Sequence, residues 1–181
     1  MTGTLDPQET MTRVLEIFPG AQRALFRRYH IGGCASCAFQ ADETLAGLCA
    51  RNNLDVPEVI QHLQASHLED EALQISPGEL AALRQAGTVR LVDIRSREEF
   101  EAARIEGAAL LSQPVMQEML GRWPREEMVV LYDHRGRQSL DAAAYFMGQG
   151  FKNVRCLRGG IDAWSREADA KIPRYRLELS P

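Results

Sequence analysis

Two cysteines stand three positions apart in the segment Cys34-Ala35-Ser36-Cys37. At this spacing two thiolates can bind one metal ion or close a small disulfide. Gly32 and Gly33 precede the pair and favour a turn, so we expect the cysteines on a loop. Four roles are open for the pair: a redox dithiol, metal or cluster binding, a carrier of sulfane sulfur, or a tight turn without chemistry.

A single Cys-x-x-Cys pair supplies only two of the four soft ligands that zinc or a small iron-sulfur cluster normally takes. His30 and Cys49 are the candidates for further ligands, although Cys49 is in helical phase with Leu45 and Leu48, which favours a core position. Two chains that each contribute one pair would also complete the set. Zinc or an iron-sulfur cluster at Cys34 and Cys37 is therefore coupled to the hypothesis of a homodimer.

The first half of the chain has the pattern of four short helices, each with apolar residues at spacings of three and four. Asp6 is the expected N-cap of the first helix, with Pro7 at the first helical position, and Asp42 is the expected N-cap of the third. The second runs from residue 21 to about 29, and the fourth starts near residue 55. The pattern predicts a small all-α domain over residues 1–68, with a linker over 69–75.

The second half alternates β-type and helical segments over residues 76–178. Apolar strands that alternate with helices predict a parallel sheet covered on both faces. A polar loop follows one of these strands and precedes an alanine-rich helix. The expected strands are 89–93, 128–132 and 153–157 with a short apolar stretch at 108–111, and the expected helices are 76–83, 97–104, 116–123, 139–149 and one after Gly159-Gly160.

Several segments of this half resemble the rhodanese-like domain family, in order and at the family's spacing. The resemblance covers about residues 75–175 and implies a doubly wound parallel α/β domain, preceded here by the small all-α domain. It makes the polar loop after Tyr132 the family's active loop. The matching segments are LVDIRSREEF (91–100), ARIEGA (103–108), VVLYDHRGRQS (129–139), the alanine-rich helix, and GFKNVRCLRGGIDAW (150–164).

In active members of that family a cysteine opens the loop, backbone amides surround it as an anion-binding nest, and a persulfide forms on its sulfur. The resemblance places Asp133 at the cysteine's position. A carboxylate can satisfy the same amides but cannot accept sulfane sulfur, so we expect no thiosulfate sulfurtransferase chemistry here. Phosphatase chemistry is not expected either, because the cysteine is absent and Ser139 stands where a phosphatase loop would need an arginine. His134 is expected to be exposed or to cap a helix, and the alternative is an acid or base beside the loop. The whole loop is Asp133, His134, Arg135, Gly136, Arg137 and Gln138.

The resemblance also bears on three residues outside the loop. Asp93 and Arg95 match the family's Asp-x-Arg at the end of a strand, and we expect them to form a structural pair. Cys156 falls inside the strand 153–157, where a small buried apolar role is expected. Arg104 and Glu106 depart from the family, which commonly has His and Pro at these positions.

The first half resembles a small helical Cys-x-x-Cys domain that accompanies hybrid-cluster-associated proteins and precedes di-iron proteins that repair iron-sulfur clusters. The segments that carry this resemblance are VLEIFPGAQRALFRRYHIGGCASC (14–37) and ETLAGLCARNNLDVPEVIQHL (43–63). The resemblance implies sulfur, redox or iron-sulfur chemistry at Cys34 and Cys37.

Composition limits the function classes. The chain is 45% apolar, its net charge is −4, and it lacks both an apolar run of about 18 residues and a basic leader followed by an apolar stretch. We therefore expect a cytoplasmic protein with a protein partner or a second copy, and no nucleic acid or membrane. The leading hypothesis is a non-catalytic binding or regulatory module coupled to the cysteine loop. The alternative is a sulfurtransferase or thiol oxidoreductase that uses Cys34 and Cys37 as working thiols.

Overall fold

A computed structural model of the chain describes residues 5–32, 39–87 and 89–174. The chain divides into two compact units, Met1–Ala72 and Leu73–Pro181. The first is helical and the second is α/β, which confirms the predicted fold class. The predicted end of the second domain at residue 178 lies outside the described residues. Within the described ranges, no helix combines the length and apolar character that crossing a membrane requires.

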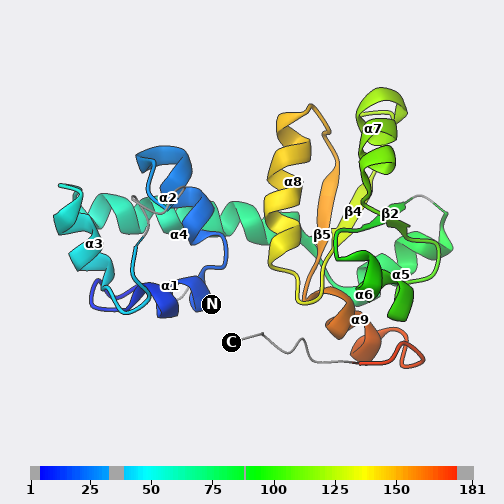
Figure 1. Cartoon of the computed structure of the whole chain (residues 1–181), viewed down its shortest axis with the longest axis horizontal. Coiled ribbons are helices and arrows are strands. Elements are labelled where there is room, and N and C mark those ends of the chain that lie inside the picture. The colour runs from blue at the N-terminus through cyan, green and yellow to red at the C-terminus, as the bar shows by residue number, and fades with distance from the viewer. Residues whose placement is uncertain (1–4, 33–38, 88, 175–181) are drawn as a thin grey trace. The chain divides into compact units, whose positions relative to one another are not determined.

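The helical unit contains α1 (Met11–Ile17), α2 (Ala21–Tyr29), α3 (Leu45–Arg51) and α4 (Val56–Leu73) (Figure 1). These helices enclose one apolar core. Its largest fully buried side chains are Met11, Phe18, Leu25, Leu45, Leu48 and Leu63.

The caps of α1 and α3 differ from the predicted ones. Thr10 accepts a hydrogen bond from the backbone of Arg13, and Thr44 accepts one from Gly47. The two threonines pair as an antiparallel bridge, which holds both in the extended conformation that an N-cap needs. The prediction of Asp6 and Asp42 as caps was wrong, because this long-range pairing starts each helix later in the chain.

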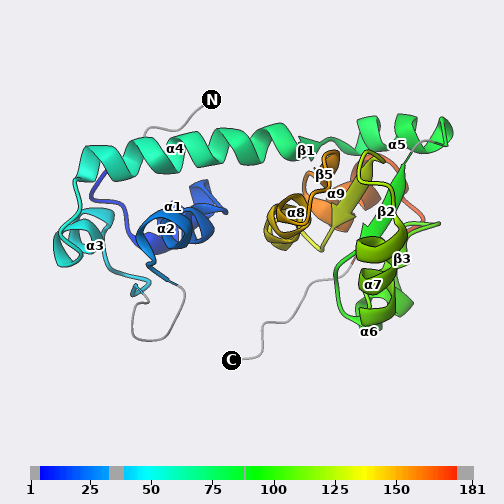
Figure 2. The ribbon, with the colours of Figure 1, turned by 90° about the horizontal axis from the view of Figure 1, so that it is seen from above.

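The expected linker at 69–75 consists of regular structure instead. Helix α4 continues to Leu73 as one unbroken helix, and strand β1 (Gln74–Ile75) follows directly (Figure 2). Residues 58–75 contain neither glycine nor proline and include many good helix formers, so nothing in this stretch ends the helix early. Asp70, in the last turns, is buried and pairs with Arg23 of α2 at 2.5 Å.

The α/β unit is built on a five-stranded parallel sheet in the described part of the chain, with strand order β1-β5-β4-β2-β3. Strand β1 was not predicted, because two residues carry no readable pattern. The strands are β1, β2 (Arg90–Asp93), β3 (Ala109–Leu110), β4 (Val129–Tyr132) and β5 (Val154–Leu157), and the helices are α5 (Pro77–Gln85), α6 (Arg97–Ala102), α7 (Gln113–Arg122), α8 (Gln138–Gly148) and α9 (Gly160–Glu167).

Alternate residues of the central strands face two separate apolar layers. On one face, Val130 and Tyr132 of β4 belong to the same cluster as residues of α5 and α9, including Trp164. On the other face, Val129 and Leu131 belong to a cluster with residues of α7 and α8. The sheet is therefore covered on both faces, and the carboxyl ends of its parallel strands lie at one edge.

Candidate functional site

The loop between β4 and α8 wraps its backbone around one carboxylate. Asp133 directly follows β4 and is 3% exposed. Four backbone N–H groups donate to it: Gly136 donates to Oδ1, while Arg137 (2.9 Å), Gln138 (2.5 Å) and Ser139 (3.2 Å) donate to Oδ2. The loop is thus an anion-binding nest at the N-terminus of α8, and the anion it holds is its own side chain.

The loop is held from behind by the turn that enters α9. The carbonyl of Asp133 accepts a hydrogen bond from Ile161 N at 2.9 Å, and the carbonyl of His134 accepts one from Asp162 N at 3.2 Å. Gly160 has a φ of +60°, and a Cβ there would lie 2.4 Å from the Asp133 carbonyl oxygen. Only glycine allows this close approach of two backbones, so the turn into α9 fixes the position of the loop.

His134 lies differently from its predicted position. The sequence indicates an exposed or capping histidine, whereas the structure buries it to 8% exposure. The reason is the docking of its own backbone on the start of α9, a contact that sequence spacing does not reveal. Burial alone would raise the pKa of Asp162, but the hydrogen bond and charge of Arg174, with smaller effects of Arg166 and His134, hold that pKa below its usual range.

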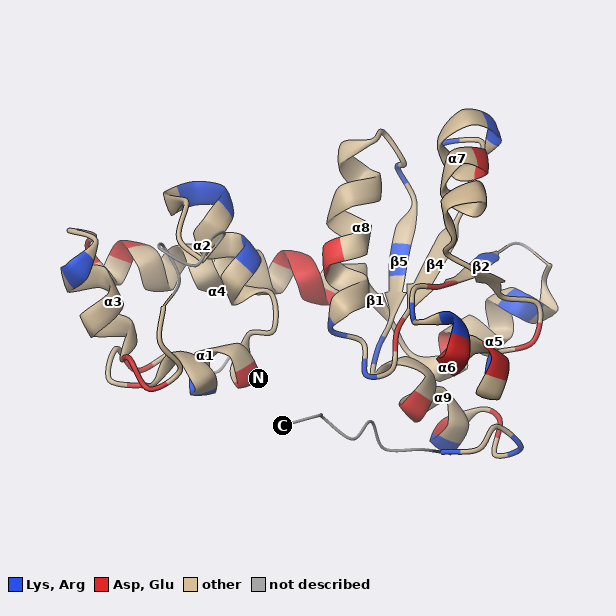
Figure 3. Cartoon of the chain, viewed as in Figure 1, with Lys and Arg blue, Asp and Glu red and all other residues tan. Residues whose placement is uncertain are grey.

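The remaining side chains of the loop point into solvent. Arg135, Arg137 and Gln138 are exposed, whereas Gly136 is buried against β5 and the turn into α9. Figure 3 shows basic residues along the turn that leads into α8. The loop therefore combines a hydrogen-bonded carboxylate in its interior with arginine side chains on its outer surface.

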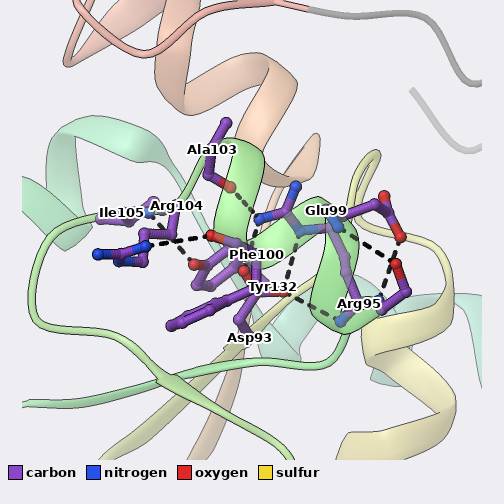
Figure 4. Close-up of polar contacts among 9 residues, drawn as sticks. Asp93, Arg95, Glu99, Phe100, Ala103, Arg104, Ile105 and Tyr132 are labelled. Atoms are coloured by element: carbon purple, nitrogen blue, oxygen red, sulfur yellow. Dashed lines mark hydrogen bonds and ion pairs between the residues drawn. The ribbon is translucent and has the colours of Figure 1, made fainter.

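A buried ion pair stands at the end of the neighbouring strand β2 (Figure 4). The Arg95 guanidinium donates to both carboxylate oxygens of Asp93, at 2.9 and 2.6 Å, and also to the carbonyl of Ala103 at 2.6 Å. The two side chains are 2% and 0% exposed. This bidentate geometry confirms the predicted structural pair, and it ties the end of β2 to the segment after α6.

Tyr132 joins this cluster to the loop, a role that the sequence did not indicate. It is the last residue of β4, it pairs in register with Asp93, and its hydroxyl accepts a hydrogen bond from Ile105 N at 3.3 Å. Burial, followed by the charge of Asp93, raises the pKa of the Tyr132 hydroxyl far above its usual range. Tyr132 is therefore a neutral phenol that fixes the strand from which Asp133 emerges.

Cys156 is the thiol that the described structure places next to the loop. It lies in β5, is fully buried, and donates from Sγ to the carbonyl of Ser139 at 3.2 Å. This confirms the predicted buried role of Cys156. Because the thiol is covered and bonded to the helix backbone, it supports the start of α8 and has no access to a substrate.

The predicted site in the helical unit falls largely outside the described residues, since Cys34 and Cys37 lie in the segment 33–38. Of the possible further ligands, His30 is exposed at the end of α2, and Cys49 is fully buried in the helical core. Burial raises the pKa of the Cys49 thiol. Among the residues that the structure does describe, no group of three or more His, Cys, Asp or Glu side chains could hold a metal ion. The metal hypothesis therefore stays a prediction.

Comparison with known proteins gives matches for the α/β part. The family model described as "Rhodanese-like domain" matches residues 76–167. The thiosulfate sulfurtransferase GlpE of Pseudomonas entomophila is 35% identical over 94 residues, which are 52% of this chain and 85% of that protein. A sulfurtransferase of Allochromatium vinosum is 40% identical over 78 residues, which are 43% of this chain and 73% of that protein.

Two solved structures are also similar to this chain. The human single-domain sulfurtransferase TSTD1 is 26% identical, with a TM-score of 0.46 over 52% of this chain and 96% of that chain. The rhodanese-like domain of the Anabaena sp. protein Alr3790 is 18% identical, with a TM-score of 0.48 over 60% of this chain and 90% of that chain.

Proposed function

The chain belongs to the rhodanese-like domain family over residues 76–167, and we propose that this domain is a non-catalytic binding or regulatory module. Its relatives are sulfurtransferases by name, and the chain is a member of that wider family. We propose further that sulfur, redox or iron-sulfur chemistry of the protein takes place at Cys34 and Cys37.

The bonding of Asp133 carries the first part of the proposal. Sulfur transfer from thiosulfate needs a thiolate that attacks the sulfane sulfur, forms a new sulfur–sulfur bond and breaks the old one, so that sulfite leaves. Asp133 stands at the loop position where active members have that cysteine. Its carboxylate oxygens can accept hydrogen bonds but cannot form the persulfide.

The same bonding disfavours a substrate anion inside the loop. The N–H groups of residues 136–139 already donate to Asp133. An entering thiosulfate would have to displace a carboxylate that is covalently tethered at this position. The loop is therefore complete without a ligand, and its outer surface is what remains for recognition of a partner.

The assignment of thiol chemistry to the helical unit follows from the other two cysteines. Cys49 and Cys156 are both fully buried, so neither can meet a substrate in the folded chain. Cys34 and Cys37 have the spacing of a pair that exchanges a disulfide, binds metal or carries sulfur.

A rate measurement on the full chain tests the proposal. We expect thiosulfate-to-cyanide sulfur transfer at the uncatalysed background for the double variant Cys34→Ser, Cys37→Ser. The GlpE relative from P. entomophila serves as the positive control. Any activity of the unmodified chain should disappear in the double variant, because the two remaining thiols, Cys49 and Cys156, are buried.

Two results would distinguish the parts of the proposal. Activity that persists in the double-serine variant would show that the Asp133 loop is catalytic and would overturn the non-catalytic assignment. Full activity in the unmodified chain, lost in the double variant, would make the protein a sulfurtransferase through its cysteine loop, with the rhodanese-like domain as the partner-binding part.

A further inference from the structure

We propose that the outer surface of the β4–α8 loop docks an acidic segment of a partner protein. The surface, which we call the arginine rim, consists of Arg135, Arg137 and Arg158. This inference rests on the proposed binding role of the domain and names the chemistry of its partner.

The three arginines of the rim are brought together by one backbone contact. Gly136 lies between Arg135 and Arg137 in the chain and packs against the backbone after β5. A Cβ atom placed on Gly136 would lie 2.7 Å from Gly159 N and 2.8 Å from Leu157 O. Leu157 and Gly159 are the two neighbours of Arg158 in the chain. The loop and the end of β5 therefore present all three arginines from one edge of the sheet, although they come from segments about twenty residues apart.

The side chains of the rim lie at the surface. Arg135, Arg137 and Arg158 are exposed. Within the described ranges 5–32, 39–87 and 89–174, the side chains of Arg135 and Arg137 form no ion pair or hydrogen bond. Arg158 donates from Nε to Gln74 at 3.3 Å, which orients its guanidinium on the edge of the sheet. The charge of Arg158 also acts on the carboxylate of Glu79. Many arginines outside the rim have acidic partners within the chain, namely Arg13, Arg23, Arg28, Arg51, Arg90, Arg95, Arg166 and Arg174.

The backbone beneath the rim is fixed before any partner arrives. Arg137 N donates to Asp133 Oδ2 at 2.9 Å, and the carbonyls of Asp133 and His134 accept hydrogen bonds from the first turn of α9. A surface on a fixed backbone loses less conformational entropy on binding than a flexible loop does. Asp133 thus has a role beyond blocking catalysis: it holds the rim in shape.

The chemistry of the rim favours a segment with several carboxylates over a small anion. The loop amides are already bonded to Asp133, so a single sulfate or thiosulfate would meet only exposed side chains and would bind weakly. A peptide with neighbouring Asp or Glu residues can engage several guanidinium groups at once, and its binding gains from multivalency. A nucleic acid is disfavoured because the chain has a net charge of −4 and Asp141 and Asp162 flank the rim in sequence.

The test measures binding of a fluorescein-labelled oligoglutamate peptide to the full chain by fluorescence anisotropy. We expect saturable binding that weakens with salt and falls by about tenfold or more in the variant Arg135→Glu, Arg137→Glu. The matched control is Arg122→Glu, since Arg122 is exposed and ends α7, away from the loop, and its effect should stay below about twofold. Circular dichroism of each variant confirms that it is folded.

Each other outcome overturns the inference. Absence of peptide binding, or equal losses in the rim variant and the control, would remove the rim as an acidic-partner site. Labelled single-stranded DNA that binds more tightly than the peptide would assign the rim to nucleic acid, and sulfate that competes at the peptide's own concentration would assign it to a small anion. Thiosulfate-to-cyanide rates on the same preparations show separately whether the proposed non-catalytic role has failed.

Discussion

Replacement of Asp133 by alanine should destabilise the α/β unit more than any change to an exposed residue of the loop. The substitution removes the acceptor for four backbone N–H groups without adding bulk. A donor that loses its acceptor in a buried position costs free energy because neither protein nor water can replace the bond.

The magnitude follows from which donors are covered. The hydrogen bonds from the amides of Arg137 and Gln138 are partly buried, whereas those from Gly136 and Ser139 are buried. Two buried amides left without an acceptor cost about 1–3 kcal/mol each, and partial hydration lowers that sum. We therefore expect the free energy of unfolding to fall by about 2–4 kcal/mol.

Tryptophan fluorescence during guanidinium chloride unfolding measures the stability of the α/β unit, which contains Asp133. The chain has two tryptophans, Trp123 and Trp164, and both lie in the α/β unit. The control is Asp141→Ala, which removes an acidic residue from the first turn of the same helix and should cost less than about 1 kcal/mol. Formate added to Asp133→Ala should restore part of the lost stability by binding in the vacated nest, with little effect on the unmodified chain.

Equal stability of Asp133→Ala and Asp141→Ala would refute this reasoning, since it would mean that the nest does not depend on its carboxylate. A formate effect of the same size in both the variant and the unmodified chain would also contradict it, because the added anion would then be acting elsewhere.

Three further predictions use the same chain. Arg95→Met should lower the free energy of unfolding by about 3–5 kcal/mol in the fluorescence assay, because it leaves the Asp93 carboxylate buried and unpaired. Adding Asp93→Leu should recover part of that loss. A loss below about 1 kcal/mol for Arg95→Met would contradict the buried pair. Gly160→Ala should cost about 1–3 kcal/mol more than Gly87→Ala, because both have positive φ but only Gly160 has the loop backbone in the way; equal losses would mean that the turn into α9 does not hold the loop. Iodoacetamide should modify Cys34 and Cys37 much faster than Cys49 and Cys156, as measured by peptide mass analysis. The reason is that Cys49 and Cys156 are fully buried and that burial raises the pKa of the Cys49 thiol. Equal rates for all four cysteines would contradict this prediction.

The sequence predicts those parts of the fold that depend on local pattern. The apolar runs around Val130 and Val154 indicate buried strands, and the motif Ser76-Pro77-Gly78-Glu79 predicts the start of α5, where a capping box forms. The parallel arrangement then follows from the alternation of strands and helices.

The features that the sequence did not indicate depend on long-range contacts. Thr10 and Thr44 become caps because they pair across about thirty residues, and His134 is buried because its backbone docks on the start of α9. Tyr132 reads as a core strand residue, and its bond to Ile105 appears only when β4 meets the segment after α6. In each case, local spacing carries no information about the partner.

The same limit applies to the candidate site. The position of Asp133 in the loop comes from the resemblance of the surrounding segments to a family, and its four amide bonds come from the structure. The sequence could indicate that a carboxylate fits the nest, but it could not show how completely the loop amides close around it.

Persulfide trapping tests the central claim most directly, namely that the domain keeps the family's anion nest but lacks its thiol. Two full-length variants are incubated with thiosulfate and compared by intact mass: one carries Cys34→Ser and Cys37→Ser, and the other carries Asp133→Cys in addition. We predict no adduct on the first and an increase of about 32 Da, the mass of one sulfur, at position 133 of the second. A persulfide on the first variant, or none on the second while it remains folded, would contradict the account.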